Sequence, residues 1–241
     1  RSHFAITHRK AGWDCFRHLE IMASRSAPLM LDAVGIPEFS MVHYPKHAFR
    51  QILTNAHTGG VPSMRAHEDL YAFMTENLTT QAMIHYLLQC TQITDVNRVL
   101  FVDQQHPDAV DYLSTLTLIG LKEHFGQQCS PLFPAPWIYR DYDGDVSHLY
   151  GRGFGTTRLL DPDLRADNEL SGTNAELRYP DFDTLVVGSI SRNTELAKEL
   201  ARHFAPDRTI WIHGEDTPPL ADQVRSHRAF GTHLFIRSID V

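Results

Sequence analysis

The stretch Val99-Leu100-Phe101-Val102 decides the fold class, because it is an unbroken apolar run of strand length. Such a run is typical of a strand that is buried on both faces, as in a parallel sheet. Helical patterns follow it, from about Val110 to Phe125 and from Asn193 to Phe204. Three further apolar runs of the same kind are Thr184–Val187, Thr209–Ile212 and Leu234–Ile236. Strands that alternate with helices predict an α/β fold with Rossmann-like units and parallel sheets.

The first part of the chain carries a shorter version of this pattern. It consists of a strand, a polar turn, a helix and a second strand, over Phe4–Thr7, His8–Gly12, Trp13–Ser24 and Pro28–Leu31. In the helix, apolar residues recur at steps of three and four, which makes one apolar stripe. Prolines and a Gly-Gly pair predict irregular structure over residues 32–66, and a helix is expected from about Glu68 to Cys90.

These patterns divide the chain into two parts, residues 1–95 and 96–241. The second part has a complete alternation of strands and helices. In the first part, two strands and two helices cannot cover both faces of a sheet. Either the chain is a fragment, or other segments complete this core, with self-association as one source of them.

Composition narrows the class of protein. The net charge of -7 disfavours a general nucleic-acid binder. No apolar run approaches the roughly 20 residues that span a bilayer, so no transmembrane segment is expected. The three cysteines stand far apart, which favours a reducing, cytoplasmic location without disulfides. The 15 histidines are scattered without an HExxH motif, so we expect no metal site.

Residues 4–23, FAITHRKAGWDCFRHLEIMA, combine Ala-Gly-Trp-Asp-Cys, Arg-His and Glu in that order. This run resembles the donor-binding segment of exostosin-like and related bacterial glycosyltransferases, and the resemblance extends through Ala27–Leu31. Enzymes of this family have a GT-B architecture, in which two Rossmann-like lobes face a cleft. The resemblance implies that residues 1–95 are part of the donor lobe and that 96–241 are a second lobe on the acceptor side.

Elementary physical chemistry supports a donor site at this turn. A helix N-terminus presents unpaired amides and a partial positive charge, which suit a diphosphate. Gly12 lets the backbone approach the ligand, and Lys10 adds positive charge. Arg17 and Glu20 are three residues apart and share one helix flank. By the resemblance, Glu20 binds the ribose, and Arg17 or His18 faces the phosphates or the sugar. The alternative is that Arg17 and Glu20 form a surface ion pair.

Two features depart from the family pattern. Arg25 stands where related enzymes usually have a small residue, often Gly, so it would crowd or contact a donor. Residues 98–126 and 147–157 resemble the other lobe, which normally comes first in GT-B enzymes. The order of the lobes is therefore permuted here, or spliced from neighbouring units.

Two segments of the second part carry further candidate residues. The loop Tyr150–Phe154 contains Tyr150 and, between two glycines, Arg152. It would clamp a sugar or a phosphate, or it would be a plain surface turn. Glu215 or Asp216, which follow a predicted strand, would be the catalytic base that deprotonates an acceptor hydroxyl. Their alternative is an acidic cluster at a helix N-terminus.

The hypothesis favoured by these patterns is a glycosyltransferase that moves a sugar from a nucleotide-sugar donor to a glycan or cell-surface acceptor, without a required cofactor. Displacement at the anomeric carbon would release the nucleoside diphosphate. The alternative is a non-catalytic module of the same fold that binds a nucleotide, a glycan or a partner protein. A third hypothesis is an unrelated α/β phosphate-binding protein. Asp103 stands at a predicted strand end, as the acceptor aspartate of a phosphoacceptor domain does. The companion acidic pair that such domains need is missing, so this class of protein is disfavoured.

Overall fold

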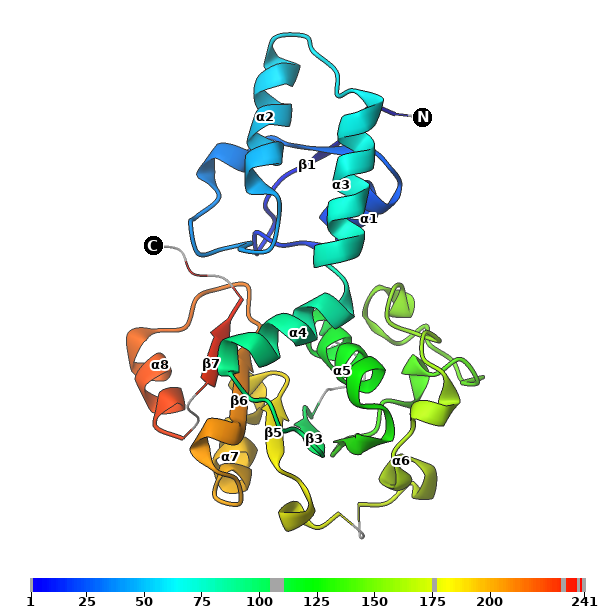
Figure 1. The fold of residues 1–241 in the computed structure, drawn as a ribbon, viewed down its shortest axis with the longest axis vertical. Helices are drawn as coiled ribbons and strands as arrows, with labels where there is room; N and C mark the ends of the chain where they lie inside the picture. Colours follow the sequence, from blue (N-terminus) through cyan, green and yellow to red (C-terminus); the bar gives the residue numbers. More distant parts are fainter. Residues whose placement is uncertain (1, 105–110, 175–176, 231–232, 238, 240–241) are drawn as a thin grey trace. The chain divides into compact units, whose positions relative to one another are not determined.

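The computed structural model describes residues 2–104, 111–174, 177–230, 233–237 and 239. The chain is an α/β protein that divides into two compact units (Figure 1). The first unit comprises residues 1–82 with 215–218 and 237–241, and the second comprises 83–214 with 219–236. In the described part of the chain, no helix has the length and apolarity needed to cross a bilayer.

The first unit is built on a parallel strand pair with a helical crossover. Its elements are β1 (Phe4–Thr7), α1 (Phe16–Ala23), β2 (Ala27–Met30), the 3₁₀ turn η1 (Ala33–Gly35), α2 (Lys46–His57) and α3 (Met64–Asn77). Phe4 lies opposite Ala27, and Thr7 opposite Met30. Both predicted strands are confirmed. The predicted helix is confirmed as α1, but it begins at Phe16 rather than at Trp13.

The core of the first unit uses a helix that the sequence pattern did not predict. Phe49 of α2 is fully buried and packs in one cluster with Met22 of α1, Met30 of β2 and Leu70 of α3. The prediction of irregular structure over residues 32–66 is therefore wrong over α2. This helix covers the sheet and supplies the apolar surface that two strands lack.

The helix predicted over Glu68–Cys90 is two helices, α3 and α4 (Thr80–Thr91). The break falls at Leu78 and Thr79, where the Thr79 hydroxyl accepts a hydrogen bond from the Ala82 amide at 3.2 Å. A threonine that binds an amide three residues ahead starts a new helix. Most of α4 belongs to the second unit, so the units divide near residue 82 rather than at residue 95.

The second unit is a parallel sheet of five strands in the order β4-β3-β5-β6-β7. The strands are β3 (Val99–Val102), β4 (Cys129–Pro131), β5 (Thr184–Val187), β6 (Thr209–His213) and β7 (His233–Ile236). Besides α4, the helices are α5 (Tyr112–Phe125), α6 (Asp167–Ser171), α7 (Ile190–Ala201) and α8 (Ala221–Arg228). The 3₁₀ turns are η2 (Gly126–Gln128), η3 (Pro136–Ile138), η4 (Tyr150–Gly153), η5 (Pro162–Leu164), η6 (Tyr179–Asp181) and η7 (Pro206–Arg208).

Successive residues of β3 point into two different cores. Val99 and Phe101 pack with residues of α4 and α5, whereas Leu100 and Val102 pack with residues of α7. Helices therefore cover both faces of the sheet, which confirms the predicted α/β fold with a parallel sheet (Figure 1). The predicted helix start at Val110 lies outside the described residues.

Counted along the chain, the strands of this sheet have the order 2-1-3-4-5. This order reverses direction between β3 and β5. In doubly wound sheets, ligands bind beyond the carboxyl ends of the strands at such a switch point. The second unit therefore has its own position at which a ligand site is expected, next to Asp103.

Candidate functional site

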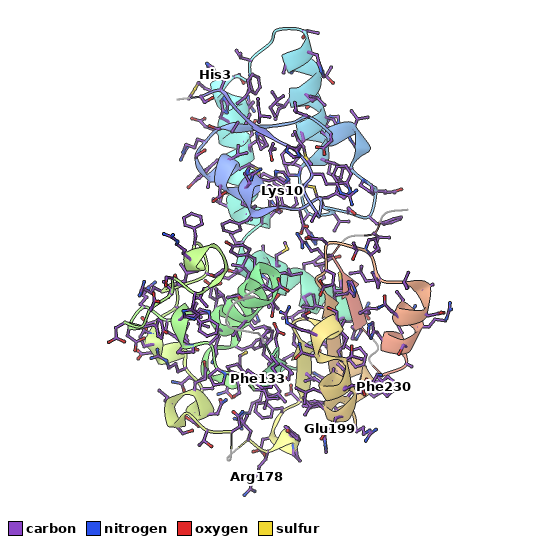
Figure 2. All side chains as sticks on the ribbon, turned by 180° about the vertical axis from the view of Figure 1, so that it is seen from behind. His3, Lys10, Phe133, Arg178, Glu199 and Phe230 are labelled. Carbon is purple, nitrogen blue, oxygen red and sulfur yellow. The ribbon has the colours of Figure 1, made fainter. Side chains whose placement is uncertain are left out.

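The polar turn between β1 and α1 lies at the carboxyl edge of the first sheet. The Arg9 amide donates to Asp32 Oδ2 at 2.8 Å, and its guanidinium lies 5.0 Å from the centre of the Trp13 ring. Lys10, labelled in Figure 2, is exposed. Asp32 follows β2, and its Oδ1 is buried with no hydrogen-bond partner among the described residues. The turn is thus fixed to the end of β2 and leaves one buried acceptor atom.

The first turn of α1 carries the candidate donor ligands. Cys15 precedes the helix with extended backbone, and its side chain makes no capping hydrogen bond. Arg17 is half-buried and Glu20 is exposed. Among the described residues these two side chains form no ion pair with each other. Both side chains are therefore available to a ligand, and the alternative of a surface ion pair is not what the structure shows.

His18 does not face a ligand, which corrects the expectation from sequence. Its side chain is fully buried, with Nε2 3.1 Å from the Trp13 carbonyl oxygen and Nδ1 3.2 Å from the Thr7 hydroxyl. The carbonyl can only accept, so Nε2 carries the proton and Nδ1 accepts from Thr7. His18 holds the turn against β1 as a neutral ring, and burial lowers its pKa.

This burial predicts that the first unit loses stability in mild acid. The folded pKa of His18 lies below 6.5. The unfolded chain therefore binds the proton first, and stability present above about pH 6.5 falls as the pH decreases toward the folded pKa. We expect denaturant titrations at pH 7.5 and 5.5 to show a smaller loss for His18→Gln than for the wild type. An equal loss in both proteins would contradict this role of His18.

An ion-pair network closes over Gly12. The Arg237 guanidinium donates from Nε to Asp14 Oδ1 at 2.5 Å, from Nη1 to Asp216 Oδ1 at 2.7 Å and from Nη2 to the Asp14 carbonyl oxygen at 2.7 Å. A Cβ atom on Gly12 would lie 2.6 Å from Asp216 Oδ1. Only glycine permits this close approach without displacing the carboxylate. The structure thus brings together two predicted site residues, Gly12 and Asp216.

The same network engages one oxygen of Asp216, which is one of the two residues expected to act as the base. A general base needs a carboxylate that is available to a hydroxyl proton. Asp216 is instead paired with Arg237, and its side chain is 43% exposed. Glu215 is exposed beside it. Sequence reasoning missed Asp14 and Arg237, which lie 223 residues apart, because no local pattern joins them.

Arg25 lies away from this network. Its backbone has a φ of 55°, in the left-handed region that favours glycine, and its guanidinium stacks over the Tyr71 ring at 4.1 Å. The backbone explains why a glycine suits this position, which is the residue type that the resemblance leads one to expect there. In the structure, the Arg25 side chain packs against Tyr71 of α3.

In the second unit, a buried carboxylate marks the switch point. The Asp103 side chain has no exposed surface and accepts from Arg192 Nε at 2.7 Å, Arg192 Nη2 at 2.6 Å and Asn193 Nδ2 at 2.7 Å. The Ser114 hydroxyl also donates to it. Every one of these groups is used in binding Asp103. The arrangement joins β3, α5 and α7, and it leaves Asp103 unsuited to accept a phosphoryl group.

The predicted clamp loop forms η4 in the second unit. Gly151, Arg152 and Gly153 all have a positive φ, between 54° and 70°. Arg152 is exposed, and the Tyr150 side chain lies outside the described residues. The loop is a tight turn that presents one cation to solvent.

Within the described residues, no group of three or more His, Cys, Asp or Glu side chains is placed to hold a metal ion. Comparisons with known protein families, with curated proteins and with solved structures find no match to this chain.

Proposed function

We propose that the chain is a nucleotide-sugar-dependent glycosyltransferase of GT-B type, and that its first unit binds the donor. The observation that carries the proposal is the turn at the carboxyl edge of β1. It combines a glycine in close contact with a carboxylate, an uncapped helix start and the side chains Arg17 and Glu20. Diphosphates bind at such helix starts through amides and positive charge.

The buried oxygen of Asp32 supports a ligand rich in hydroxyl groups. A buried acceptor without a partner costs about 1–3 kcal/mol, so a structure retains it where another group satisfies it. Asp32 Oδ1 is such an atom, next to the turn. The atom has almost no surface open to a water-sized group, so a ribose or sugar hydroxyl would donate to it only after the Asp32 side chain turns outward.

In the proposed reaction, an acceptor hydroxyl attacks the anomeric carbon, the bond from this carbon to the diphosphate breaks, and the nucleoside diphosphate leaves. Lys10 and Arg17 stabilise the charge that develops on the leaving group. Glu20 holds the ribose, as the resemblance implies. Glu215 or Asp216, the two carboxylates expected from sequence to act as base, would receive the acceptor proton.

Thermal unfolding tests this proposal. UDP, GDP, CMP and their sugar conjugates are added at millimolar concentration, and the midpoint is compared with that of the free protein. A ligand at 100 times its dissociation constant stabilises by about 2.7 kcal/mol. We expect the nucleotides of one nucleobase to raise the unfolding midpoint of the wild type. The same rise is expected in Glu76→Ala, a control at an exposed helical glutamate, and no rise in Glu20→Ala. A shift that Glu20→Ala retains would contradict the assigned ribose ligand.

A second candidate function is a non-catalytic module that binds a nucleotide, a glycan or a partner protein. The pairing of Asp216 with Arg237 favours it, since in the free protein it engages one of the two carboxylates expected to act as base. Turnover of a sugar nucleotide by the purified chain would exclude this alternative, and binding without turnover would support it.

A further inference from the structure

Arg237 is a cation held at the donor turn by two carboxylates. It directly follows β7 in the chain but belongs to the first unit. All three of its nitrogens donate to Asp14 or Asp216, and its side chain is 20% exposed. A guanidinium with this fork of donors matches phosphate oxygens as well as it matches carboxylates.

An oxyanion already occupies the position that the proposed function assigns to the diphosphate. Asp216 Oδ1 would lie 2.6 Å from a Cβ on Gly12, and Arg237 Nη2 would lie 3.2 Å from it. The carboxylate thus sits against the glycine backbone of the turn, in contact with the cation. This is the environment in which a diphosphate oxygen is expected.

The two carboxylates are not equivalent. Burial raises the pKa of Asp14, Arg237 acts in the opposite direction, and the negative charge of Asp216 adds a smaller rise. Asp216 contributes one contact and is 43% exposed, whereas Asp14 is 28% exposed and binds Arg237 through both side chain and backbone. Asp216 is therefore the partner that a stronger anion would displace into solvent.

We propose that Arg237 binds the diphosphate of a nucleoside diphosphate or its sugar conjugate, and that Asp216 holds this place until the ligand enters. The inference rests on the proposed function, because it places a new ligand residue in the same donor site. It assigns Asp14 as the positioning residue that keeps the Arg237 guanidinium at the turn.

Calorimetric titration of the full chain tests the inference, with UDP and GDP compared with uridine and guanosine. Arg237→Gln should weaken binding of the nucleoside diphosphate at least tenfold, which is about 1.4 kcal/mol, and leave nucleoside binding unchanged. Asp216→Asn should tighten diphosphate binding severalfold, because it removes the competing charge. Arg65→Gln, at an exposed cation of the same unit, should bind as the wild type does.

The outcomes separate a ligand residue from a structural clamp. If Arg237 only fastens its segment to the turn, Asp216→Asn will weaken binding as Arg237→Gln does, and the inference is overturned. Wild-type affinity in Arg237→Gln overturns it as well, while the proposed function stands. If no nucleoside diphosphate binds the wild type, both fail. Should Arg237→Gln not fold, Arg237→Lys with Asp216→Asn keeps the charge comparison.

Discussion

Replacement of Lys122 by Met is expected to lower the free energy of unfolding by about 3–5 kcal/mol, because it leaves a buried carboxylate without its cation. The Lys122 and Glu169 side chains are 0% and 3% exposed and form an ion pair. The ammonium also donates to the Leu164 carbonyl oxygen at 3.1 Å. The Tyr139 hydroxyl donates to Glu169 at 2.8 Å, and burial raises the pKa of Tyr139, which keeps this donor protonated.

Denaturant titration of the single and double variants measures this effect. In Lys122→Met/Glu169→Gln the uncompensated charge is removed, so this double variant should be more stable than Lys122→Met alone. Such non-additivity is the signature of a coupled pair. Arg225→Met is the control, since the Arg225–Asp222 pair on α8 is exposed and such pairs contribute less than about 1 kcal/mol. A loss below about 1 kcal/mol in Lys122→Met would contradict the prediction.

The buried pair explains how a long irregular segment is fastened to the second sheet. Lys122 lies in the last turn of α5, and Glu169 lies in the short helix α6. Glu169 also accepts the Ala166 amide at 2.9 Å, which starts α6. The sequence pattern predicts no helix or strand between Phe125 and Thr184, and nothing in it indicates that Glu169 pairs with a residue of α5.

The parts of the fold that could be predicted are those with a strong local signal. Strands β3, β5 and β6 are continuous apolar runs, since each is buried on both faces. β4 is missed because Cys129-Ser130-Pro131 has no apolar run, and only pairing with β3 makes it a strand. Helix α8 is missed for a related reason: it is polar and buries His227.

Helix α2 could not be predicted for a different reason. Phe49, Ile52 and Leu53 are buried at helical spacing, so the stripe was present in the sequence. The prolines at 37, 45 and 62 favour irregular structure instead, although Pro45 stands just outside the helix, as the residue before its first turn. A proline at the start of a helix does not interrupt the helix.

The same distinction between local signals and long-range contacts applies to the candidate site. The turn and the helix after it could be predicted, because glycine, cations and the apolar stripe are neighbours in sequence. The burial of His18 and the pairing of Asp216 with Arg237 depend on which segments fold over the turn. Spacing along the chain carries no such information, so the surroundings of His18 and Asp216 could not be predicted from it.

The second prediction with a large effect concerns Asp103. Asp103→Ala is expected to lower the free energy of unfolding by about 3 kcal/mol, toward the lower end of the range for broken buried pairs, because Arg192 is 27% exposed and partly screened by solvent. The variant also removes the acceptor of Ser114 and Asn193, which join α5 and α7 to β3. Asp103→Asn should lose less, since its amide oxygen still accepts.

Chemical denaturation of these two variants, with Asp222→Ala as an exposed control on α8, checks the prediction. The ranking expected is Asp222→Ala, then Asp103→Asn, then Asp103→Ala as the least stable. If Asp103→Ala unfolds as the wild type does, the carboxylate is not needed to hold the switch point together. The predicted ranking instead means that the buried charge at the end of β3 has a structural role, because it holds α5 and α7 to the strand.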